Sequence, residues 1–377
     1  MTDSMTDSRN LLHSLINAAE KAANIARLCR SNEQLLALLV QEKTGKEANA
    51  RFEHDFKTLA DVLIQETIKH DVGGEFPEML ENIQGEESPS FASATGKAVN
   101  ICIGATEEET TDCLLQILQS EYEDAAKALA AEVHRVVEFH KEMHEDLPQL
   151  PEMDYTQFGI WIDPIDATAE YISGDTIFTN FPGITSTGLD CVTVLIGLYE
   201  RVTGIPVIGI ISQPFRNKIE ENIYTSSLYW GIAFPDFKAH SKHLNTIPTH
   251  DGLMGIFSSS EHAELLQKMS DLGYAFAFSA GAGHKALKVI TGEVDVYVLS
   301  KGSTYKWDTC APQAILRSLN GGIFDLSSSI EKGEPISVIY ISDDDSIDGS
   351  WRCNSKGIIA VRNLDLMHDI LKKLENA

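Results

Sequence analysis

The sequence lacks the segments that mark secreted and membrane-spanning proteins. Its densest apolar runs, Val192–Tyr199 and Ile205–Ile211, are too short to cross a bilayer. No apolar stretch follows basic residues near the N-terminus, so we expect no signal peptide. The six cysteines are scattered and include no Cys-x-x-Cys pair, which is typical of reduced and mostly buried thiols. These absences favour a cytoplasmic protein.

Basic residues are scarce as well. The chain has 30 Lys and Arg against 56 Asp and Glu, which gives a formal net charge of −26. We therefore expect neither nucleic acid nor an anionic membrane as a partner. An anionic substrate would also be repelled unless metal ions reversed the charge locally. With 377 residues, 43% of them hydrophobic, the chain is long enough for a large core in one or two domains.

Several common catalytic motifs are missing. The sequence contains no Gly-x-x-x-x-Gly-Lys-Ser/Thr, no Gly-x-Ser-x-Gly and no His-Glu-x-x-His. Gly281-Ala-Gly283-His-Lys-Ala286 does have the spacing of a dinucleotide-binding turn. It comes late in the chain, however, and no acid stands at the end of a clear second strand about twenty residues on. We interpret it as a tight turn whose backbone approaches a neighbour closely.

The apolar patterns predict an α/β protein (α+β in its arrangement) with two domains, 1–250 and 251–377. The first domain is expected to combine helices with a mainly antiparallel sheet, whose later strands form a meander. Helices are predicted over 9–30, from 31 to about 42, 55–69 and 106–142, and strands over 160–162, 191–200, 206–213 and 227–233. The second domain alternates strands and helices, including a strand over 337–341 and a helix opened by Asp308 as its N-cap.

The segment Gly159–Thr168 contains the most informative motif. Its apolar, β-prone half ends in Asp163-Pro164-Ile165-Asp166. Because proline biases the preceding residue toward extended backbone, Asp163 is expected at the strand end and Asp166 in the turn. Both carboxylates and the Ile165 carbonyl are hard oxygen ligands of the kind that Mg²⁺ prefers. The alternative is a simple turn in which an Asp caps the next helix.

Two further features extend this motif. The amides of Ala167 and Thr168 follow directly and can bind a phosphate at the start of a helix. Other acids, Asp55, the pair Glu86/Glu87 and Asp308, also lie at expected strand ends or helix starts. Because adjacent residues on a strand point to opposite faces, at most one of the glutamates should be a primary ligand. Carboxylates without His or Cys partners suit a multi-magnesium site better than zinc, although Asp55 could simply cap a helix.

Three motifs in this order resemble the lithium-sensitive, magnesium-dependent phosphatase superfamily, which includes inositol monophosphatases, bisphosphate nucleotidases and fructose bisphosphatases. They are Gly85-Glu-Glu-Ser88, Asp163-Pro-Ile-Asp-Ala-Thr168 and Trp307-Asp-Thr-Cys-Ala-Pro312. The likeness covers nearly the whole chain and is weakest over 120–155 and 215–250. It implies a layered α-β-α-β-α sandwich with the site between the two halves. The likeness is strongest to enzymes that remove the 1-phosphate from inositol 1,4-bisphosphate and inositol 1,3,4-trisphosphate.

The resemblance also implies a role for each acid. Glu86, Asp163 and the Ile165 carbonyl would hold a first Mg²⁺, and Asp163, Asp166 and Asp308 a second. The attacking group would be a metal-activated water that displaces the leaving oxygen in line, without a phosphoenzyme. Two or three Mg²⁺ ions are the implied cofactors, and Li⁺ is the implied inhibitor.

The implied third ion is held more loosely, through water, by Asp55 and Glu86. Thr168 together with Asp55 would orient the attacking water, with Glu86 also in the catalytic group, while Glu87 would support the ligands from behind. Ala167 stands where many relatives carry a hydroxyl residue, which leaves its amide available to the substrate.

Substrate contacts are implied in the C-terminal domain. They are Gly281, Ala282, Lys285, Lys301 and Lys306, in addition to Thr168 and the Ala167 amide. Lys285 is the expected contact of the distal phosphate, and the alternative is a solvated surface lysine. Lys301 stands where the nearest relatives carry acids, so the contacts to the sugar are expected to differ.

The predicted partner is thus a small inositol polyphosphate, with no nucleic acid and no membrane, and a monomer is the favoured state. An alternative enzyme with the same metal site is a 3′-phosphoadenosine 5′-phosphate phosphatase. A different class is a catalytically silent protein that binds a polyphosphate. Intact acids in every cluster argue against silence.

Overall fold

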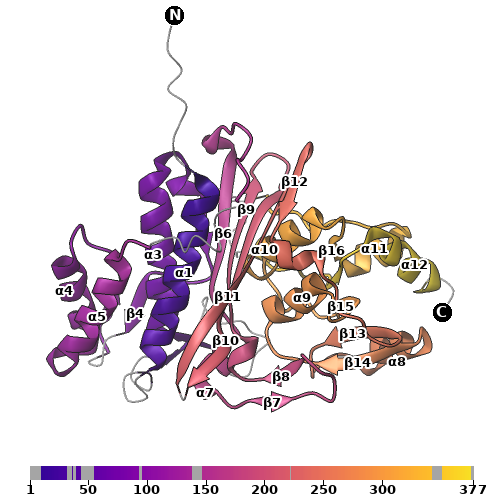
Figure 1. Ribbon diagram of the computed structural model, residues 1–377, viewed down its shortest axis with the longest axis horizontal. Helices are drawn as coiled ribbons and strands as arrows, with labels where there is room; N and C mark the ends of the chain where they lie inside the picture. The colour runs from indigo at the N-terminus through magenta and orange to yellow at the C-terminus, as the bar shows by residue number, and fades with distance from the viewer. Residues whose placement is uncertain are drawn as a thin grey trace, which may run out of the picture.

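A computed structural model describes residues 10–31, 36, 40–43, 55–92, 96–137, 147–220, 222–341 and 350–374. Its elements form alternating layers of helices and sheets (Figure 1). Helices α1 (Leu11–Arg30) and α3 (Leu59–Glu75) cover one face of a six-stranded sheet, and α9 (Ala282–Thr291) and α10 (Lys306–Ser318) cover the other. A five-stranded sheet and an outer helical layer follow. The α-β-α-β-α sandwich expected from the sequence is confirmed.

The six-stranded sheet has the strand order β12-β11-β10-β9-β6-β3. Its members are β3 (Ile83–Gly85), β6 (Phe158–Asp166), β9 (Thr193–Glu200), β10 (Pro206–Glu220), β11 (Ile223–Phe234) and β12 (Phe237–His240). Only β3 pairs in parallel within this sheet, with β6, and all its other pairs are antiparallel. The predicted meander is therefore correct, and β10 extends seven residues beyond the predicted end at Gln213 because the turn comes after Glu220.

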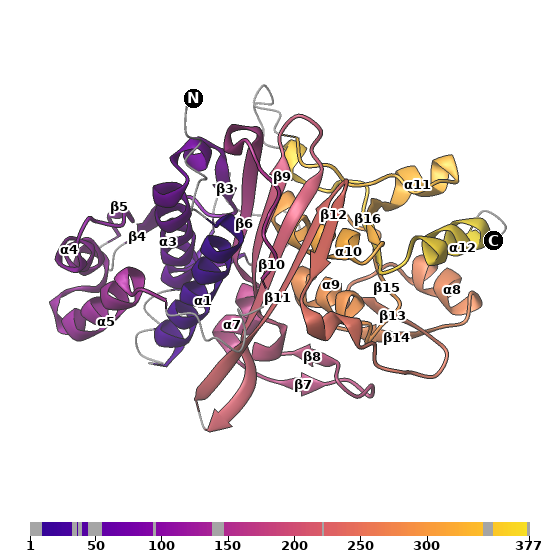
Figure 2. The same cartoon turned by 45° about the horizontal axis from the view of Figure 1, so that its top comes forward.

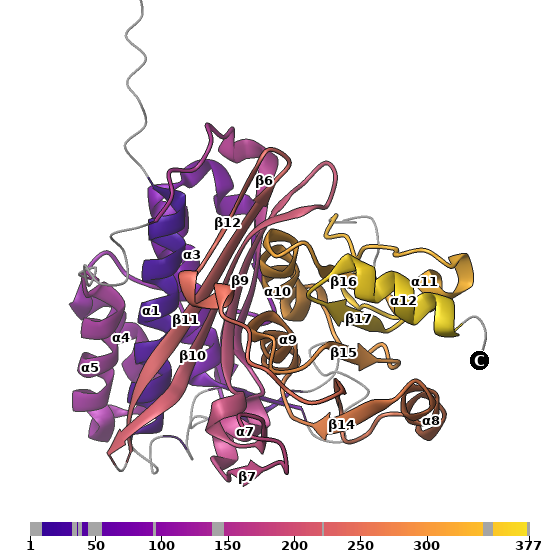
Figure 3. The same cartoon turned by 45° about the vertical axis from the view of Figure 1, so that its right-hand side comes forward.

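The five-stranded sheet has the order β14-β13-β15-β17-β16. Its members are β13 (Leu253–Phe257), β14 (Tyr274–Phe278), β15 (Val296–Leu299), β16 (Gly322–Asp325) and β17 (Ile358–Val361). Strand β13 pairs in parallel with β14 and β15, whereas β17 runs antiparallel to β15 and β16. Figure 3 shows α8 (Ala263–Asp271), α11 (Leu326–Lys332) and α12 (Leu364–Leu374) beyond this sheet.

Three local predictions for the C-terminal half and one for the N-terminal half need correction. The expected strand over 337–341 forms only an isolated bridge between Ser337 and Phe324, and α11 was not expected. The N-cap of α10 is Tyr305, and Asp308 is its third helical residue. The predicted helix ending near Glu42 is wrong at Val40–Glu42, which form β1 and pair with β2 (Phe56–Thr58). Residues 32–35 and 37–39 lie outside the described part of the chain.

The remaining elements lie at the edges of the layers. Helices α4 (Glu107–Leu118) and α5 (Glu123–His134) lie within the helical segment predicted over 106–142, and they pack against each other outside α1 (Figure 2). Two short hairpins join β4 (Ser90–Ala92) to β5 (Ala98–Asn100) and β7 (Ile177–Phe178) to β8 (Thr185–Thr187). Over the described ranges, none of the helices combines the length and apolarity needed to cross a membrane.

A row of glycines lets α10 approach the six-stranded sheet closely. Gly197 on β9, Gly209 on β10 and Gly231 on β11 are direct neighbours across the sheet. A Cβ on Gly209 would lie 2.1 Å from the Ala311 carbonyl oxygen, and one on Gly197 would lie 2.5 Å from the Ala311 nitrogen. These separations are shorter than any real contact, so the helix can occupy this position only against bare backbone. The close approach brings the first turn of α10 beside the end of β6.

The glycine row generates a stability prediction. Gly209→Ala should lower the free energy of unfolding by about 1–3 kcal/mol or more, because the added methyl group forces α10 away from the sheet. Denaturant unfolding monitored by circular dichroism measures this change. Gly74→Ala is the matched control, since a Cβ there meets nothing within 4 Å and the residue lies inside α3. Equal stability of the wild type and Gly209→Ala would contradict the packing argument.

Candidate active site

Three carboxyl groups from two elements meet between the sheets. Asp163 and Asp166 come from the last residues of β6, and Asp308 comes from the first turn of α10. One oxygen of each lies within 4.8 Å of the others, and all three groups are buried. The Asp308 Oδ2 accepts the Tyr305 amide at 2.5 Å, which fixes this side chain at the start of the helix. The structure therefore brings the two aspartates of one predicted motif together with Asp308, which the sequence placed at the start of a distant helix. Asp166, expected in the turn, is the last residue of β6.

The start of α9 holds the second of these groups. The Asp166 carboxylate accepts the amide of Gly283 at 2.8 Å, the amide of Ala282 at 3.2 Å and the Thr193 hydroxyl at 3.2 Å. Gly281 has φ 74°, and a Cβ on it would lie 2.9 Å from Asp166 Oδ2. The predicted tight turn thus places the amides of Ala282 and Gly283 against the carboxylate of Asp166.

The charges of this cluster are poorly compensated by the protein itself. Burial, followed by the charges of Glu86, Asp166 and Asp308, raises the pKa of the Asp163 carboxyl well above its ordinary value. Burial and the neighbouring carboxylates also raise the pKa of Asp308. Asp163 Oδ1 is buried without a hydrogen-bond partner. An oxygen-only donor set with excess negative charge fits a hard divalent cation such as Mg²⁺.

The turn after β6 positions Thr168. Ala167 adopts the left-handed region (φ 69°, ψ 49°), and Thr168 then begins the six-residue helix α7 (Thr168–Ser173). The Thr168 hydroxyl lies 3.0 Å from the Ile165 carbonyl oxygen and 3.5 Å from Asp61 Oδ1, and it donates to these acceptors. Asp61, which the resemblance had not implied, therefore places a carboxylate beside Thr168. The role of Asp55 stays a prediction.

The two acids of this segment differ in their surroundings. Asp61 is the third residue of α3 and closes a capping box, in which its Oδ2 accepts the Thr58 amide at 2.7 Å. Burial raises the pKa of Asp61 to about 6, although its hydrogen bonds with Thr58 oppose this shift. Asp55 precedes β2, and its Oδ1 lies 4.0 Å from the Lys43 ammonium. The Thr-x-x-Asp spacing was the signal by which the sequence could have indicated Asp61.

The paired glutamates depart from the expectation that they point to opposite faces. Strand β3 ends at Gly85, so strand alternation no longer applies to the next two residues. The Lys43 Nζ lies 2.6 Å from an oxygen of Glu86 and 2.6 Å from an oxygen of Glu87. Burial, followed by the Glu86 charge, raises the pKa of Glu87 to about 8. Nothing in the sequence pattern had indicated Lys43.

Comparisons with known proteins agree with this geometry. The sequence profile described as the inositol monophosphatase family matches residues 11–375. The chain belongs to this family. It is 37% identical to the human inositol polyphosphate 1-phosphatase and 36% identical to the bovine one, in each case over 97% of both chains. It is 28% identical to the human 3′(2′),5′-bisphosphate nucleotidase 1 over 88% of this chain and 87% of that protein.

Solved structures of low sequence identity share the fold. The extragenic suppressor protein suhB from Bartonella henselae superposes with a TM-score of 0.51 at 16% identity, covering 97% of this chain and 99% of that one. An IMPase from Thermotoga maritima gives a TM-score of 0.50 at 15% identity, covering 97% and 96%. The layered arrangement is thus that of inositol monophosphatase-family proteins.

The lysines proposed as substrate contacts have protein partners. Lys285 is buried, and its ammonium donates to the carbonyls of Gly281 at 2.7 Å and Ser279 at 3.1 Å. Lys306 donates to the Ile339 carbonyl at 2.5 Å, and burial lowers its pKa to about 8. Lys301 donates to the carbonyl of Ser260. Lys285 therefore holds the turn that carries Gly281, and it is not the solvated lysine considered as the alternative. Its role as a phosphate contact stays a prediction.

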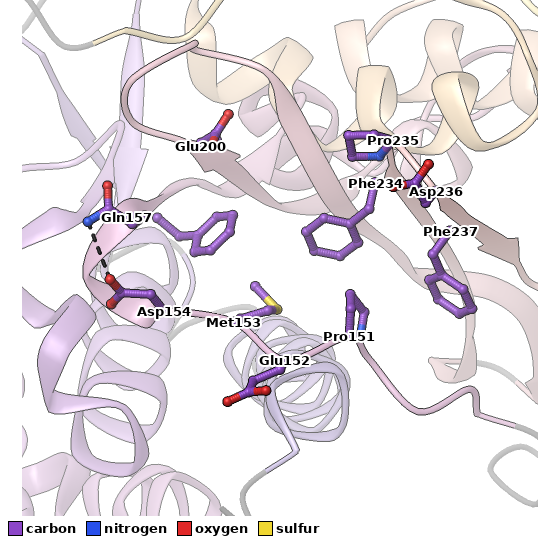
Figure 4. Close-up of a pocket in the computed structure, with 11 residues that line it drawn as sticks. Pro151, Glu152, Met153, Asp154, Gln157, Glu200, Phe234, Pro235, Asp236 and Phe237 are labelled. Carbon is purple, nitrogen blue, oxygen red and sulfur yellow. Dashed lines mark hydrogen bonds between the residues drawn. The ribbon is translucent and has the colours of Figure 1, made fainter.

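The protein also has a surface groove of about 350 Å³, whose lining residues are drawn in Figure 4. This groove lies away from the acidic cluster. Phe158 at the beginning of β6 lines it, whereas the acidic cluster lies at the strand's end. Phe234, Phe237 and Met153 contribute its apolar lining, and its charged lining residues are all acidic. They are Glu152, Asp154, Glu200 and Asp236. A groove of this charge is unsuited to a phosphorylated substrate.

The raised pKa of Asp163 generates a prediction for the metal-free protein. Because the folded-state pKa lies above the unfolded value of 3.8, this group favours folding at lower pH, and the benefit is lost as the pH rises. In EDTA at neutral pH, Asp163→Asn should raise the free energy of unfolding by about 1–3 kcal/mol, the scale of the penalty for a buried polar group without a partner. The difference should shrink as the pH falls toward 4.

Urea unfolding at several pH values measures this effect. Asp236→Asn is the control, because this exposed residue lies in the groove described above, away from the acidic cluster. A pH-independent effect of Asp163→Asn would show that the side chain acts through packing and not through its charge.

Proposed function

We propose that the protein is a magnesium-dependent phosphomonoesterase that removes the 1-phosphate from inositol 1,4-bisphosphate and inositol 1,3,4-trisphosphate. The buried cluster of Asp163, Asp166 and Asp308, each with an oxygen within 4.8 Å of the others, is the observation that carries the proposal. The full-length similarity to inositol polyphosphate 1-phosphatases supports the choice of substrate. A cytoplasmic location and a monomeric state stay predictions.

The acids divide into two groups of ligands in this proposal. Asp163, Asp166 and Asp308 would hold one Mg²⁺, and Asp163, Glu86 and the Ile165 carbonyl would hold another. Mg²⁺ bound there lowers the pKa of a coordinated water and neutralises charge on the phosphate. The chain's overall charge of −26 makes this neutralisation a requirement for binding an anionic substrate. The amides that hold Asp166 keep its oxygens aimed at the cluster.

Thr168 and Asp61 would orient the attacking water. The Thr168 hydroxyl donates its proton toward Asp61 and the Ile165 carbonyl, so its lone pairs can accept a hydrogen bond from the attacking water. Asp61 is held in turn by Thr58 at the start of α3, which limits its rotation. Asp61 therefore replaces Asp55 as the proposed partner of Thr168.

A substrate panel in the presence of Mg²⁺ tests the function. We expect phosphate release from both inositol polyphosphates to be faster than from inositol 1-phosphate or 3′-phosphoadenosine 5′-phosphate. Asp308→Asn should abolish release from every substrate, since it removes a ligand of the cluster. Faster release from the nucleotide would assign the chain to the bisphosphate nucleotidases. Binding without release from any substrate would indicate a silent polyphosphate-binding protein.

The arrangement of Thr168 and Asp61 yields a kinetic prediction. Thr168→Ala and Asp61→Asn should each lower kcat by about 10²–10³, the typical loss on removal of one preorganised polar contact. Their KM values should change little, because the proposed role of both side chains is to orient the attacking water. Asp55→Asn should lower kcat less than Asp61→Asn. The reverse order of the two aspartate variants in steady-state kinetics would restore Asp55 as the partner of Thr168.

Lithium inhibition is the remaining prediction from the proposed metal site. Li⁺ should inhibit turnover at Mg²⁺ concentrations that support activity, by occupying the site of Asp166 and Asp308 as product forms. Initial rates at fixed Mg²⁺ and increasing LiCl measure the effect, with NaCl as the control for ionic strength. Full activity at millimolar Li⁺ would contradict the predicted lithium sensitivity.

A further inference from the structure

Lys43 places a positive charge inside the acidic site. Its Nζ lies 2.6 Å from Glu86 Oε1, 2.6 Å from Glu87 Oε1 and 4.0 Å from Asp55 Oδ1. Only 3% of its side chain is exposed. An ammonium group this deeply buried keeps its charge because carboxylates surround it. Lys43 is thus bound by three acids, as a metal ion would be.

The backbone fixes Lys43 in this position. Strand β1 pairs with β2 in the register Glu42↔Phe56, and the Lys43 amide continues the ladder by donating to the Asp55 carbonyl at 2.7 Å. Strand β2 leads directly into α3, which carries Asp61. On the other side, the Glu86 amide donates to the Ile162 carbonyl at 3.1 Å, beside Asp163. The lysine is therefore held by the same framework as the catalytic acids.

The carboxylates of Asp55 and Glu86 are the ones that the resemblance assigns to a third, loosely held magnesium ion. The Lys43 ammonium lies between them and also contacts Glu87. It contacts Oε1 of Glu86 at 2.6 Å. A magnesium ion placed beside this ammonium would experience direct charge repulsion.

We propose that Lys43 takes the place of the third magnesium ion, so that the protein binds two divalent ions and supplies the third cation itself. This inference rests on the proposed metal-dependent function. A lysine cannot activate water, so its contribution is to position Glu86 and Glu87. It does so before any metal binds, because the contacts are made by the protein alone.

Counting bound ions tests the proposal directly. Mn²⁺ is the probe, with free ion measured by electron paramagnetic resonance and binding isotherms by calorimetry. We expect two ions per chain for the wild type and for Lys43→Arg, which keeps the charge. Lys43→Met keeps the length and removes the charge, so it should bind a third ion.

Thermal stability gives a second readout that needs no turnover. In EDTA, Lys43→Met should melt at a lower temperature than the wild type, because Glu86 and Glu87 lose their cation. Divalent ions should restore most of the difference. Lys21→Met is the matched control: the Lys21 Nζ lies 2.6 Å from Asp71 Oδ2, and 9% of its side chain is exposed. Its melting temperature should fall equally with and without divalent ions, since the pair with Asp71 lies apart from the acidic cluster.

Three ions bound by an active wild type would overturn the inference and leave the proposed function intact. Two ions bound by Lys43→Met, with the same loss of stability in EDTA and in Mn²⁺, would also overturn it. No divalent ion bound by the wild type would overturn the proposed function itself. If Lys43→Met does not fold, the counts for the wild type and Lys43→Arg still decide, because the proposal requires two ions in each.

Discussion

The close approach of α10 to the six-stranded sheet is the constraint on which the site depends. Gly197, Gly209 and Gly231 leave bare backbone where the helix crosses three strands. No side chain fits there, so the separation of helix and sheet is fixed by backbone contact and varies little. Asp308 in the first turn of that helix is thereby placed among the carboxylates at the end of β6. If the helix lay farther from the sheet, the carboxylates would be separated and would bind a shared metal ion more weakly.

Bringing these acids together costs stability, and the fold offsets that cost by three means. Backbone amides at the start of α9 stabilise the Asp166 carboxylate, and the Tyr305 amide does so for Asp308. The Lys43 ammonium stabilises Glu86 and Glu87. Asp163 has the least compensation, because its buried Oδ1 has no hydrogen-bond partner. A divalent cation bound there would supply the missing charge and would couple metal binding to the stability of the site.

Most elements that carry the site could be predicted from local pattern. The alternation of strands and helices after residue 250 indicated the second sheet. The strand end expected at Asp163 comes three residues later, because β6 continues through Pro164 and Asp166 still pairs with β9. Local pattern could not choose between residues whose surroundings in the sequence are equivalent. Asp55 and Asp61 both precede or open the same helix, and only the packing of α3 against β6 places Asp61 beside Thr168. Lys285 and Lys306 were predicted to contact the substrate, and local pattern did not indicate that both ammonium groups also donate to backbone carbonyls inside the protein.

The sequence by itself determined most helices and strands of the two sheets, because apolar periodicity and turn residues act over a few positions. Its three acidic motifs indicated the family and, through that resemblance, the layered architecture and the acids of the cluster. It did not determine which side chains meet across the layers. The tertiary structure decided the position of Asp61 beside Thr168, the insertion of Lys43 and the burial of Lys285. Each depends on the register of one element against another distant in the chain, and short-range preferences carry no information about such a register.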